Sequence, residues 1–383
     1  MQFGSVNKQV QTSPAAAALI RLLRQWPRKV IAAQLLDQES PSDFLLSGAL
    51  ERTLTSLTPS RIVATRRSPA PRDRSLILCD EHSVRAISIL DPVYPSILRA
   101  IPDPPLVLYA YGSTDLLDRP SVAVVGSRQC TQSGRAIARR IAADLAQLDL
   151  PVVSGLALGI DGAAHEGALT AQGGHGSTIG VLGGGLGRFY PRQHFSLASR
   201  IISTGGLLVT EYPFFAAPLA RRFPERNRLI SGLSLATVVV EATPRSGSLI
   251  TARFALEQGR DVFAVPGPPT GITSAGCHEL IQQGAGLVCN AREIVRAISL
   301  DMGRDERSPL AQQITPSFSL KAVQSSLSSD AVCAFEHLSG YPKSFDELLL
   351  DVPFDAVKLS SALTELELSG FVQNGPVGYS LAP

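Results

Sequence analysis

Residues 238–259, VVVEATPRSGSLITARFALEQG, decide the fold. Their β-branched run ends at Glu241 and predicts a buried strand, and the amphipathic segment that opens on Ser246, Gly247 and Ser248 predicts a helix. A strand, a short turn and a helix form a phosphate cradle, because the free N–H groups at the start of a helix attract anions. The stretch has no P-loop lysine and no evident nucleophile–base pair, so it predicts binding of an anion without chemistry on it.

The same pattern recurs along the middle of the chain. Apolar runs at 121–126, 151–155, 178–185, 206–212, 235–242 and 261–267 alternate with helical segments. Continuous apolar strands between helices predict an α/β fold with a doubly wound parallel sheet that helices cover on both faces. Ligands of such sheets bind at the carboxyl ends of the strands, so the functional residues are expected there.

The flanking regions differ from this core. Residues 1–60 have helical apolar spacing, and residues 61–74, with five Arg and two Pro, indicate a linker. Three helical segments and a hairpin near the C-terminus predict a winged helix. The predicted boundaries are 1–78 for an N-terminal helical domain and linker, 79–300 for a lead-in plus the α/β domain, 301–320 for a linker and 321–383 for the winged-helix domain.

Composition narrows the class of protein. The longest apolar runs are much shorter than the ~18 residues of a membrane span, and the first 20 residues do not resemble a signal peptide. The five cysteines are scattered and form no Cys-x-x-Cys pair. These features favour a reduced, cytoplasmic protein without a structural zinc site, and neither a metal nor a cofactor is expected.

Charge is unevenly distributed. Residues 121–300 hold 16 Arg against 11 acidic residues, a net charge of +5, whereas residues 321–383 have a net charge of −5. No lysine occurs between Lys29 and Lys321. The planar guanidinium of Arg suits phosphate, so this preference for Arg over Lys supports an anionic ligand. A GC-rich genome would produce the same preference, so the preference is only supporting.

Four turns of the predicted sheet could hold an anion, at 124–135, 154–161, 183–187 and 245–251. The chain contains no G-x-G-x-x-G motif: Gly183 and Gly185 begin one, but position 188, where the third glycine would stand, is Arg. It also lacks the Gly-Lys pair of a Walker A motif. A dinucleotide cofactor is therefore not expected, while a mononucleotide remains open. Alternatively, these glycines only close tight strand–helix turns.

The segment RRFPERNRLISG, 221–232, gathers Arg221, Arg222, Arg226 and Arg228 around Phe223. Several cations with one aromatic ring suit a single nucleic-acid strand, whose phosphates pair with Arg and whose bases stack. The alternative is an exposed Arg-rich loop with Phe223 in the core.

Catalytic residues are not evident. Asp161 and His165 could be an acid–base pair, but a structural hydrogen bond is the better interpretation. Glu211 and Glu241 could act as bases or could bind and shape the Arg cluster.

Long ordered motifs resemble the DNA-processing protein A family (DprA/Smf). They are VAVVGSR (122–128), VVSGLALGIDGAAHEGAL (152–169), VLGGGLGRFYP (181–191), FPERNRLISGLS (223–234) and VVEATPRSGSLITARFALEQGRDVFAVPG (239–267). The resemblance implies a Rossmann-like domain that binds single-stranded DNA without hydrolysing it. It also implies transfer of the strand to a RecA-type recombinase in natural transformation, and a homodimer.

The residues expected to contact DNA are Gly126, Ser127, Arg128, Gly155, Arg222, Phe223, Arg226, Asn227, Arg228, Arg245, Ser246, Gly247, Ser248 and Thr251. Many family members have a Pro/Gly/Asn-rich run before the Phe-Pro pair, where this chain has AAPLARR. That departure leaves the roles of Arg221 and Arg222 open.

Two other functions remain open. A nucleoside-monophosphate glycohydrolase of the lysine-decarboxylase-like fold would use Glu211 or Glu241 near the sugar, although the PGGxGT turn of that group is only faintly echoed by RSGSLIT. A pure adaptor with a vestigial DNA site is the other. The winged helix carries Asp355, Glu365 and Glu367 against Lys358 on its third helix, so we expect it to bind protein or the rest of the chain rather than DNA.

Overall fold

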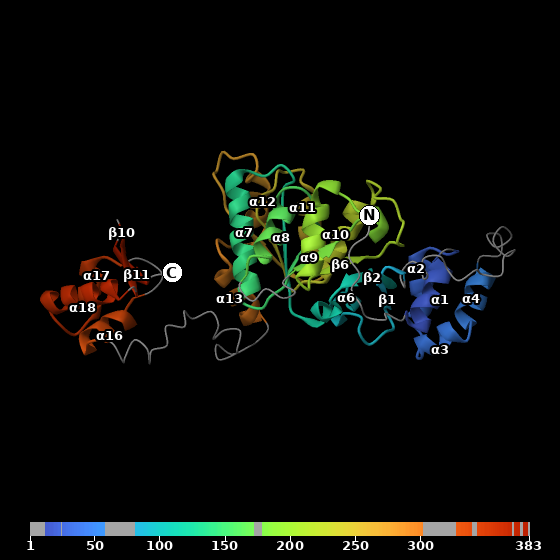
Figure 1. Cartoon of the computed structure of the whole chain (residues 1–383), viewed down its shortest axis with the longest axis horizontal. Helices are drawn as coiled ribbons and strands as arrows, with labels where there is room; N and C mark the ends of the chain where they lie inside the picture. The colour runs from blue at the N-terminus through green and yellow to red at the C-terminus, as the bar shows by residue number, and fades with distance from the viewer. Residues whose placement is uncertain are drawn as a thin grey trace. The chain divides into compact units, whose positions relative to one another are not determined.

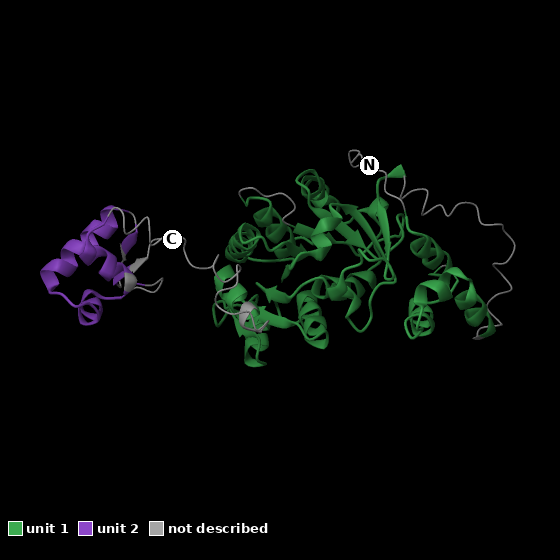
Figure 2. Cartoon of the chain, turned by 90° about the horizontal axis from the view of Figure 1, so that it is seen from below, with its two compact units in different colours: residues 1–311 green, residues 312–383 purple. Residues whose placement is uncertain are grey.

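A computed structural model describes residues 12–23, 25–57, 81–171, 178–301, 327–338, 343–369, 371–375 and 378–381. The chain divides into two compact units, residues 1–311 and 312–383 (Figure 2). The predicted linker at 61–74 and nearly all of the one at 301–320 lie outside the described residues. The predicted domain boundaries remain predictions.

The first unit is built on a nine-stranded sheet with the order β1-β2-β6-β5-β4-β3-β7-β8-β9. Its strands are β1 (Arg85–Ser88), β2 (Val107–Gly112), β3 (Val122–Val125), β4 (Val152–Ser154), β5 (Thr178–Val181), β6 (Leu207–Thr210), β7 (Ala236–Val239), β8 (Asp261–Ala264) and β9 (Gly286–Leu287). The strands from β3 to β9 pair in parallel, and β2 runs antiparallel to both β1 and β6. The predicted parallel α/β fold is therefore confirmed.

The strand order reverses at β3, which pairs with β4 on one side and with β7 on the other. Six helices pack around the parallel strands (Figure 1): α7 (Gln132–Gln147), α8 (Ile160–Ala168), α9 (Phe195–Ser203), α10 (Arg222–Gly232), α11 (Gly247–Glu257) and α12 (Ala275–Gln282). Helix α8 contacts both α7 and α9, which makes one group. In the other group α10 contacts α11, and α12 packs on β8. Since such crossovers are right-handed, the reversal puts the two groups on opposite faces of the sheet. A ligand crevice is expected where the order reverses.

Four helices precede the sheet: α1 (Pro14–Leu23), α2 (Arg28–Leu35), α3 (Pro41–Leu46) and α4 (Ala49–Leu57). Their apolar faces bury Leu19, Ile31, Leu50 and Leu54. Helix α1 packs against β1 and β2, and its core is continuous with that of the sheet (Figure 1).

The second unit contains α16 (Ser329–Glu336), α17 (Phe345–Asp351) and α18 (Ala356–Leu368), followed by the hairpin of β10 (Val372–Gly375) and β11 (Gly378–Leu381). A reciprocal cap of Ser344 and Glu347 starts α17. This order of elements is that of the predicted winged helix. Within the described parts of both units, none of the helices is long and apolar enough to span a membrane.

Candidate nucleic-acid interface

A cleft of about 690 Å³ opens at the carboxyl ends of β3 and β7, where the strand order reverses. Among the sequence-predicted residues, the cleft brings together Gly126, Ser127, Arg128, Phe223, Arg226, Asn227, Ser246, Gly247, Ser248 and Thr251. These residues come from three segments that are far apart in the sequence. The topology therefore gathers most of the predicted residues in one place.

One wall of the cleft is the N-terminus of α11. Ser246 caps this helix by accepting the Ser248 N–H at 3.3 Å, and the two hydroxyls lie 2.7 Å apart. The space beside Gly247 is open, because a Cβ there would meet nothing within 4 Å. Asn227 closes one side by donating to the Gly247 carbonyl at 3.2 Å. The exposed backbone of Gly247 and the two hydroxyls, at the positive end of the helix, form an anion cradle.

The turn after β3 also lines the cleft. Gly126 is required there, since a Cβ would lie 2.7 Å from Ile160. Ser127 is buried and accepts the Gln129 N–H at 3.1 Å, so its hydroxyl stabilises the turn. Arg128 is exposed, and its guanidinium carbon lies 5.7 Å from the centre of the Phe223 ring. A cation and an aromatic face are thus presented together at the mouth of the cleft.

A buried cation lies among the residues that line the cleft. Arg226 is 3 % exposed, donates to the Gly155 carbonyl at 2.8 Å and also bonds the Val181 carbonyl. Burial lowers the pKa of Arg226 to about 10, against the attraction of Asp161. Burial raises the pKa of Asp161 above its ordinary value, opposed by Arg226 and by the N–H groups of Ala157 and Gly155. Arg226 therefore carries its charge in a fixed position.

Gly155 allows this arrangement. A Cβ at that position would lie 2.5 Å from an Arg226 nitrogen and 2.7 Å from Asp161. Gly155 is buried beneath the pair and does not itself line the cleft. The structure thus gives it a packing role next to the site.

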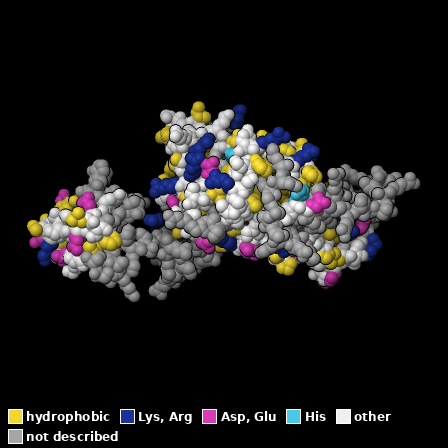
Figure 3. Space-filling model, viewed as in Figure 1, with side chains coloured by type: hydrophobic (Ala, Val, Ile, Leu, Met, Phe, Trp, Pro, Cys, Tyr) yellow, Lys and Arg dark blue, Asp and Glu magenta, His cyan; other side chains and the backbone are white. Residues whose placement is uncertain are grey.

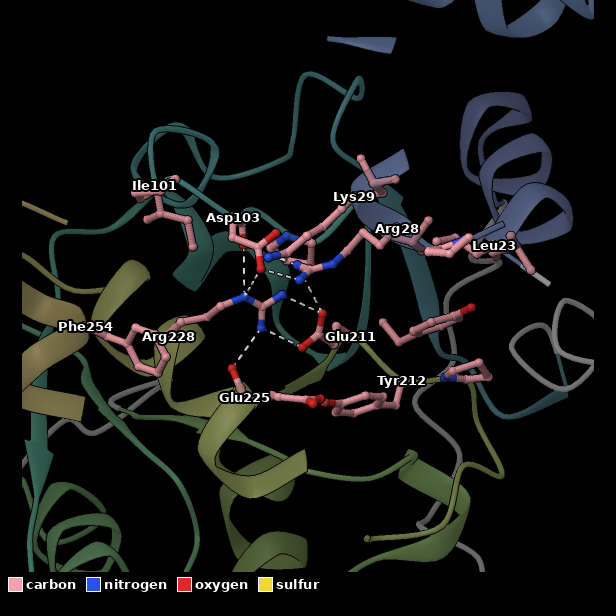
Figure 4. Close-up of a pocket in the computed structure, with 18 of the residues that line it drawn as sticks. Leu23, Arg28, Lys29, Ile101, Asp103, Glu211, Tyr212, Glu225, Arg228 and Phe254 are labelled. Atoms are coloured by element: carbon pink, nitrogen blue, oxygen red, sulfur yellow. Dashed lines mark hydrogen bonds and ion pairs between the residues drawn. The ribbon is translucent and has the colours of Figure 1, made fainter. Parts of the chain in front are cut away.

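Three predicted Arg residues do not line the cleft. Arg222 lies over the Tyr212 ring, 4.5 Å from its centre, and Arg245 is exposed in the turn before α11. Arg228 is buried on another side of α10 and lines a second cavity of about 640 Å³. Figure 4 shows Arg228 pointing toward Asp103 and Glu211, with Arg28 of α2 near the same two carboxylates.

The carboxylates considered as bases have structural partners. Glu241 accepts the Thr131 N–H at 2.8 Å and the Thr131 hydroxyl at 2.6 Å, so it supports the start of α7 rather than the Arg cluster. Glu211 is bound to Arg228, so the interpretation that it binds and shapes the Arg cluster is confirmed for this residue. Neither carboxylate lines the cleft.

Asp161 and His165 do not pair. Asp161 accepts the N–H groups of Gly155 and Ala157 at 3.1 and 3.4 Å, whereas His165 Nδ1 lies 2.7 Å from the Thr178 hydroxyl. Burial lowers the pKa of His165 to about 3. The imidazole is a neutral core group. Both side chains make structural hydrogen bonds, but Asp161 fixes the turn by itself, so the predicted bond between Asp161 and His165 is wrong.

The four predicted turns do not contribute equally. In the turn at 183–187, a Cβ on Gly183 would lie 2.8 Å from Phe223 and one on Gly185 would lie 2.1 Å from the Pro213 carbonyl, so protein atoms fill the space. The turn after β4 contributes Ala157 and Asp161. The loop after β8 contributes Ile272 and Thr273, which were not predicted from the sequence. Because β8 is the parallel neighbour of β7, the loop after β8 lies beside the turn after β7, and this neighbourhood could have indicated them.

The cleft suits an anion and offers no evident metal site. Among the described residues no group of three His, Cys, Asp or Glu could hold a metal ion. Figure 3 shows several Lys and Arg side chains, in dark blue, on the face of the first unit that it presents. The carboxylate that lines the cleft, Asp161, is 6 % exposed and faces Arg226.

Comparisons with known proteins bear on the family and the fold of the chain. The family model for DNA recombination-mediator protein A matches residues 85–299, and that for the DprA winged helix domain matches residues 319–376. Protein Smf of Escherichia coli is 39 % identical over 300 residues, which is 75 % of this chain and 74 % of that protein. DNA processing protein DprA of Streptococcus pneumoniae is 47 % identical over 210 residues, 55 % of this chain and 73 % of that protein.

Two solved structures are similar. The X-ray structure of DprA from S. pneumoniae covers 73 % of this chain and 92 % of its own, with 35 % identity and a TM-score of 0.53. A structure on the single-stranded DNA binding mode of DprA from Helicobacter pylori covers 56 % of this chain and 96 % of its own, with 30 % identity and a TM-score of 0.50. The chain belongs to the DNA recombination-mediator protein A family, also known as DprA or Smf.

Proposed function

We propose that the chain binds single-stranded DNA in the cleft between the ends of β3 and β7 and does not hydrolyse it. The observation that carries the proposal is the convergence of an exposed Arg128, a buried Arg226 and the open N-terminus of α11 on one cleft. Phosphates suit the N–H groups and guanidinium forks, and a base suits the face of Phe223. The H. pylori relative, whose structure concerns single-stranded DNA binding, supports the same ligand.

The residues around the cleft favour binding over catalysis. Among the residues that the structure describes, no histidine lines the cleft, and the hydroxyls of Ser246 and Ser248 bond each other. A glycohydrolase would need a carboxylate free to act near the sugar, but Glu211 and Glu241 are engaged elsewhere. Incubation with a panel of nucleoside monophosphates should therefore release no free base.

The decisive experiment is fluorescence anisotropy with a labelled oligo-dT over a range of salt concentrations. The logarithm of affinity should fall with the logarithm of salt by about 0.7 per phosphate neutralised. Arg128→Ala should reduce this slope by about that amount and weaken binding by about tenfold or more. Arg253→Ala, which removes an exposed charge from α11 outside the cleft, is the matched control. Equal slopes for wild type and Arg128→Ala would refute the site.

We further propose that the bound strand is handed to a RecA-type recombinase in natural transformation and that the protein acts in the cytoplasm as a homodimer. Membership of the DprA/Smf family supports these steps. A recombinase pull-down in the presence and absence of oligo-dT tests the transfer, and light scattering tests the dimer. Recombinase capture without any single-strand binding would favour the adaptor with a vestigial site.

A further inference from the structure

Two exposed aromatic rings lie beyond the cleft, on the loops that follow β5 and β6. Tyr190 is 49 % exposed and Phe215 is 46 % exposed. Single exposed apolar residues are common and need no explanation. These two, however, lie on loops that follow neighbouring parallel strands, at the same carboxyl edge of the sheet as the cleft.

The first of the two rings lies next to an aromatic residue of the cleft. The centre of the Tyr190 ring lies 5.5 Å from that of Phe223, the ring that Arg128 covers at the mouth of the cleft. The loop that carries Tyr190 then reaches Phe215, because a Cβ on Gly187 would lie 2.9 Å from the Phe215 ring. We call Phe223, Tyr190 and Phe215 the aromatic row.

The protein holds the outer part of this row in place. The Gly187 N–H donates to the Phe214 carbonyl at 2.8 Å, and the Gly185 N–H donates to the Ala216 carbonyl at 2.9 Å. Phe214 is buried, stacks on His82 and meets Phe215 edge to face at 4.9 Å. Phe215 is thus supported from below while it stays exposed, as a stacking platform requires.

Cations accompany the row. Arg188 and Arg192 flank Tyr190 in the sequence, are exposed, and form no ion pair with any residue in the described part of the chain. Tyr212 differs from Tyr190 and Phe215, because its side chain is half-buried and its hydroxyl donates to Glu225 at 3.0 Å. On the other side of the cleft, residues 265–274 contain neither an aromatic residue nor a cation.

We propose that a single strand leaving the cleft continues over the loops after β5 and β6, with bases stacked on Tyr190 and Phe215 and phosphates paired with Arg188 and Arg192. This inference rests on the proposed function and gives the strand one direction along the sheet edge. Stacking is tolerant of sequence, because every base has a flat face. The row should therefore add affinity and site size without sequence preference.

The test compares oligo-dT of about 4 and about 16 nucleotides, the range of site sizes known for surfaces that bind single strands by stacking. Tyr190→Ala and Phe215→Ala should weaken binding of the longer strand about 5- to 150-fold each. Binding of the shorter strand and the salt slope should not change. Arg188→Ala and Arg192→Ala should each lower the slope for the longer strand by about 0.7. Leu287→Ala, at an exposed apolar residue of β9, is the matched control.

Tyr190→Leu keeps an apolar side chain but removes the ring, so it separates stacking from simple apolar contact. A thermal melt of each variant checks that it is folded. The fluorescence of a 2-aminopurine base placed along the longer strand should be quenched when wild type binds and should recover with Tyr190→Ala. If Tyr190→Ala, Tyr190→Leu and Phe215→Ala bind the longer strand like wild type while Arg128→Ala does not, the path is wrong and the cleft stands. If Arg128→Ala also binds like wild type, the proposed function fails as well.

Discussion

Arg228 and Glu211 form a two-point ion pair in which Nη1 and Nη2 each lie 2.6 Å from a carboxylate oxygen. Arg228 is on α10 and Glu211 directly follows β6, so the pair fixes the helix to the end of the strand. Arg28 of α2 approaches the same carboxylate at 3.6 Å (Figure 4). The helix that supplies Arg226 and Asn227 to the cleft is therefore anchored on another side by charges that do not touch the cleft.

This anchor predicts a strong effect on stability. Glu211→Gln should destabilise the first unit by about 3–5 kcal/mol, because it leaves Arg228, whose side chain is 6 % exposed, without its main counter-charge. Urea unfolding measures the loss. Glu211→Leu combined with Arg228→Met should recover part of it, since both buried charges are then gone. A midpoint for Glu211→Gln equal to that of wild type would contradict the anchor.

Two glycines next to the site should respond differently to alanine. Gly155→Ala puts a methyl 2.5 Å from the Arg226 guanidinium and should both destabilise the fold, by about 1–3 kcal/mol, and weaken DNA binding. Gly247→Ala meets no neighbouring atom within 4 Å and should leave stability unchanged or raise it by up to about 1 kcal/mol. Its methyl would still crowd the mouth of the cradle and weaken binding of oligo-dT.

Thermal melts and anisotropy on the two variants separate these effects. Loss of stability in Gly247→Ala, or unchanged stability in Gly155→Ala, would show that the packing around Arg226 and the cradle is not as described.

Much of the fold could be predicted from the sequence, because parallel strands that are buried on both faces have continuous apolar sequences. The six predicted strands are β3 to β8. Strands β1 and β2 were missed, since prolines interrupt the segment between them, and β9 has only two residues. The reversal of strand order at β3 rests on pairings between distant segments, which no local pattern records.

The site was less predictable at α10. We treated RRFPERNR as one cluster of cations around Phe223, but the structure makes residues 222–232 a helix. Residues two apart on a helix do not share a face, so Arg226 reaches the cleft lining while Arg228 enters the second cavity. Helical spacing separates the two Arg residues, whereas the partner of Arg228, Glu211, lies 17 residues away directly after β6 and could not be predicted.

The winged helix should not contribute to single-strand binding. Two acidic residues of its third helix have structural roles, since Asp355 caps α18 and Glu365 accepts the Ser328 N–H at 2.8 Å. In Figure 3 the visible face of this unit carries more acidic than basic side chains. Lys358→Glu should therefore leave the salt slope for oligo-dT unchanged. A slope lower by about 0.7 would contradict this, because it would assign a phosphate contact to Lys358.

Stability should depend on pH through His165. Its folded pKa of about 3 lies below its ordinary value of 6.5, so the folded state favours the neutral imidazole. The associated stability is complete above pH 6.5 and is lost as the pH falls from 6.5 toward 3, by up to about 1.4 kcal/mol per pH unit. The raised pKa of Asp161 acts with the opposite sign at acidic pH, since protonation of that carboxyl is easier in the fold.

The comparison of wild type with His165→Asn cancels the contribution of Asp161. Urea midpoints measured between pH 7 and pH 5 should fall more steeply for wild type, because asparagine does not titrate. Its amide can donate to Thr178 in place of Nδ1, which lies 2.7 Å from that hydroxyl, so the variant should remain folded at pH 7. Parallel pH profiles for the two proteins would mean that His165 is not held neutral by burial, and the core packing around β4 and β5 would need revision.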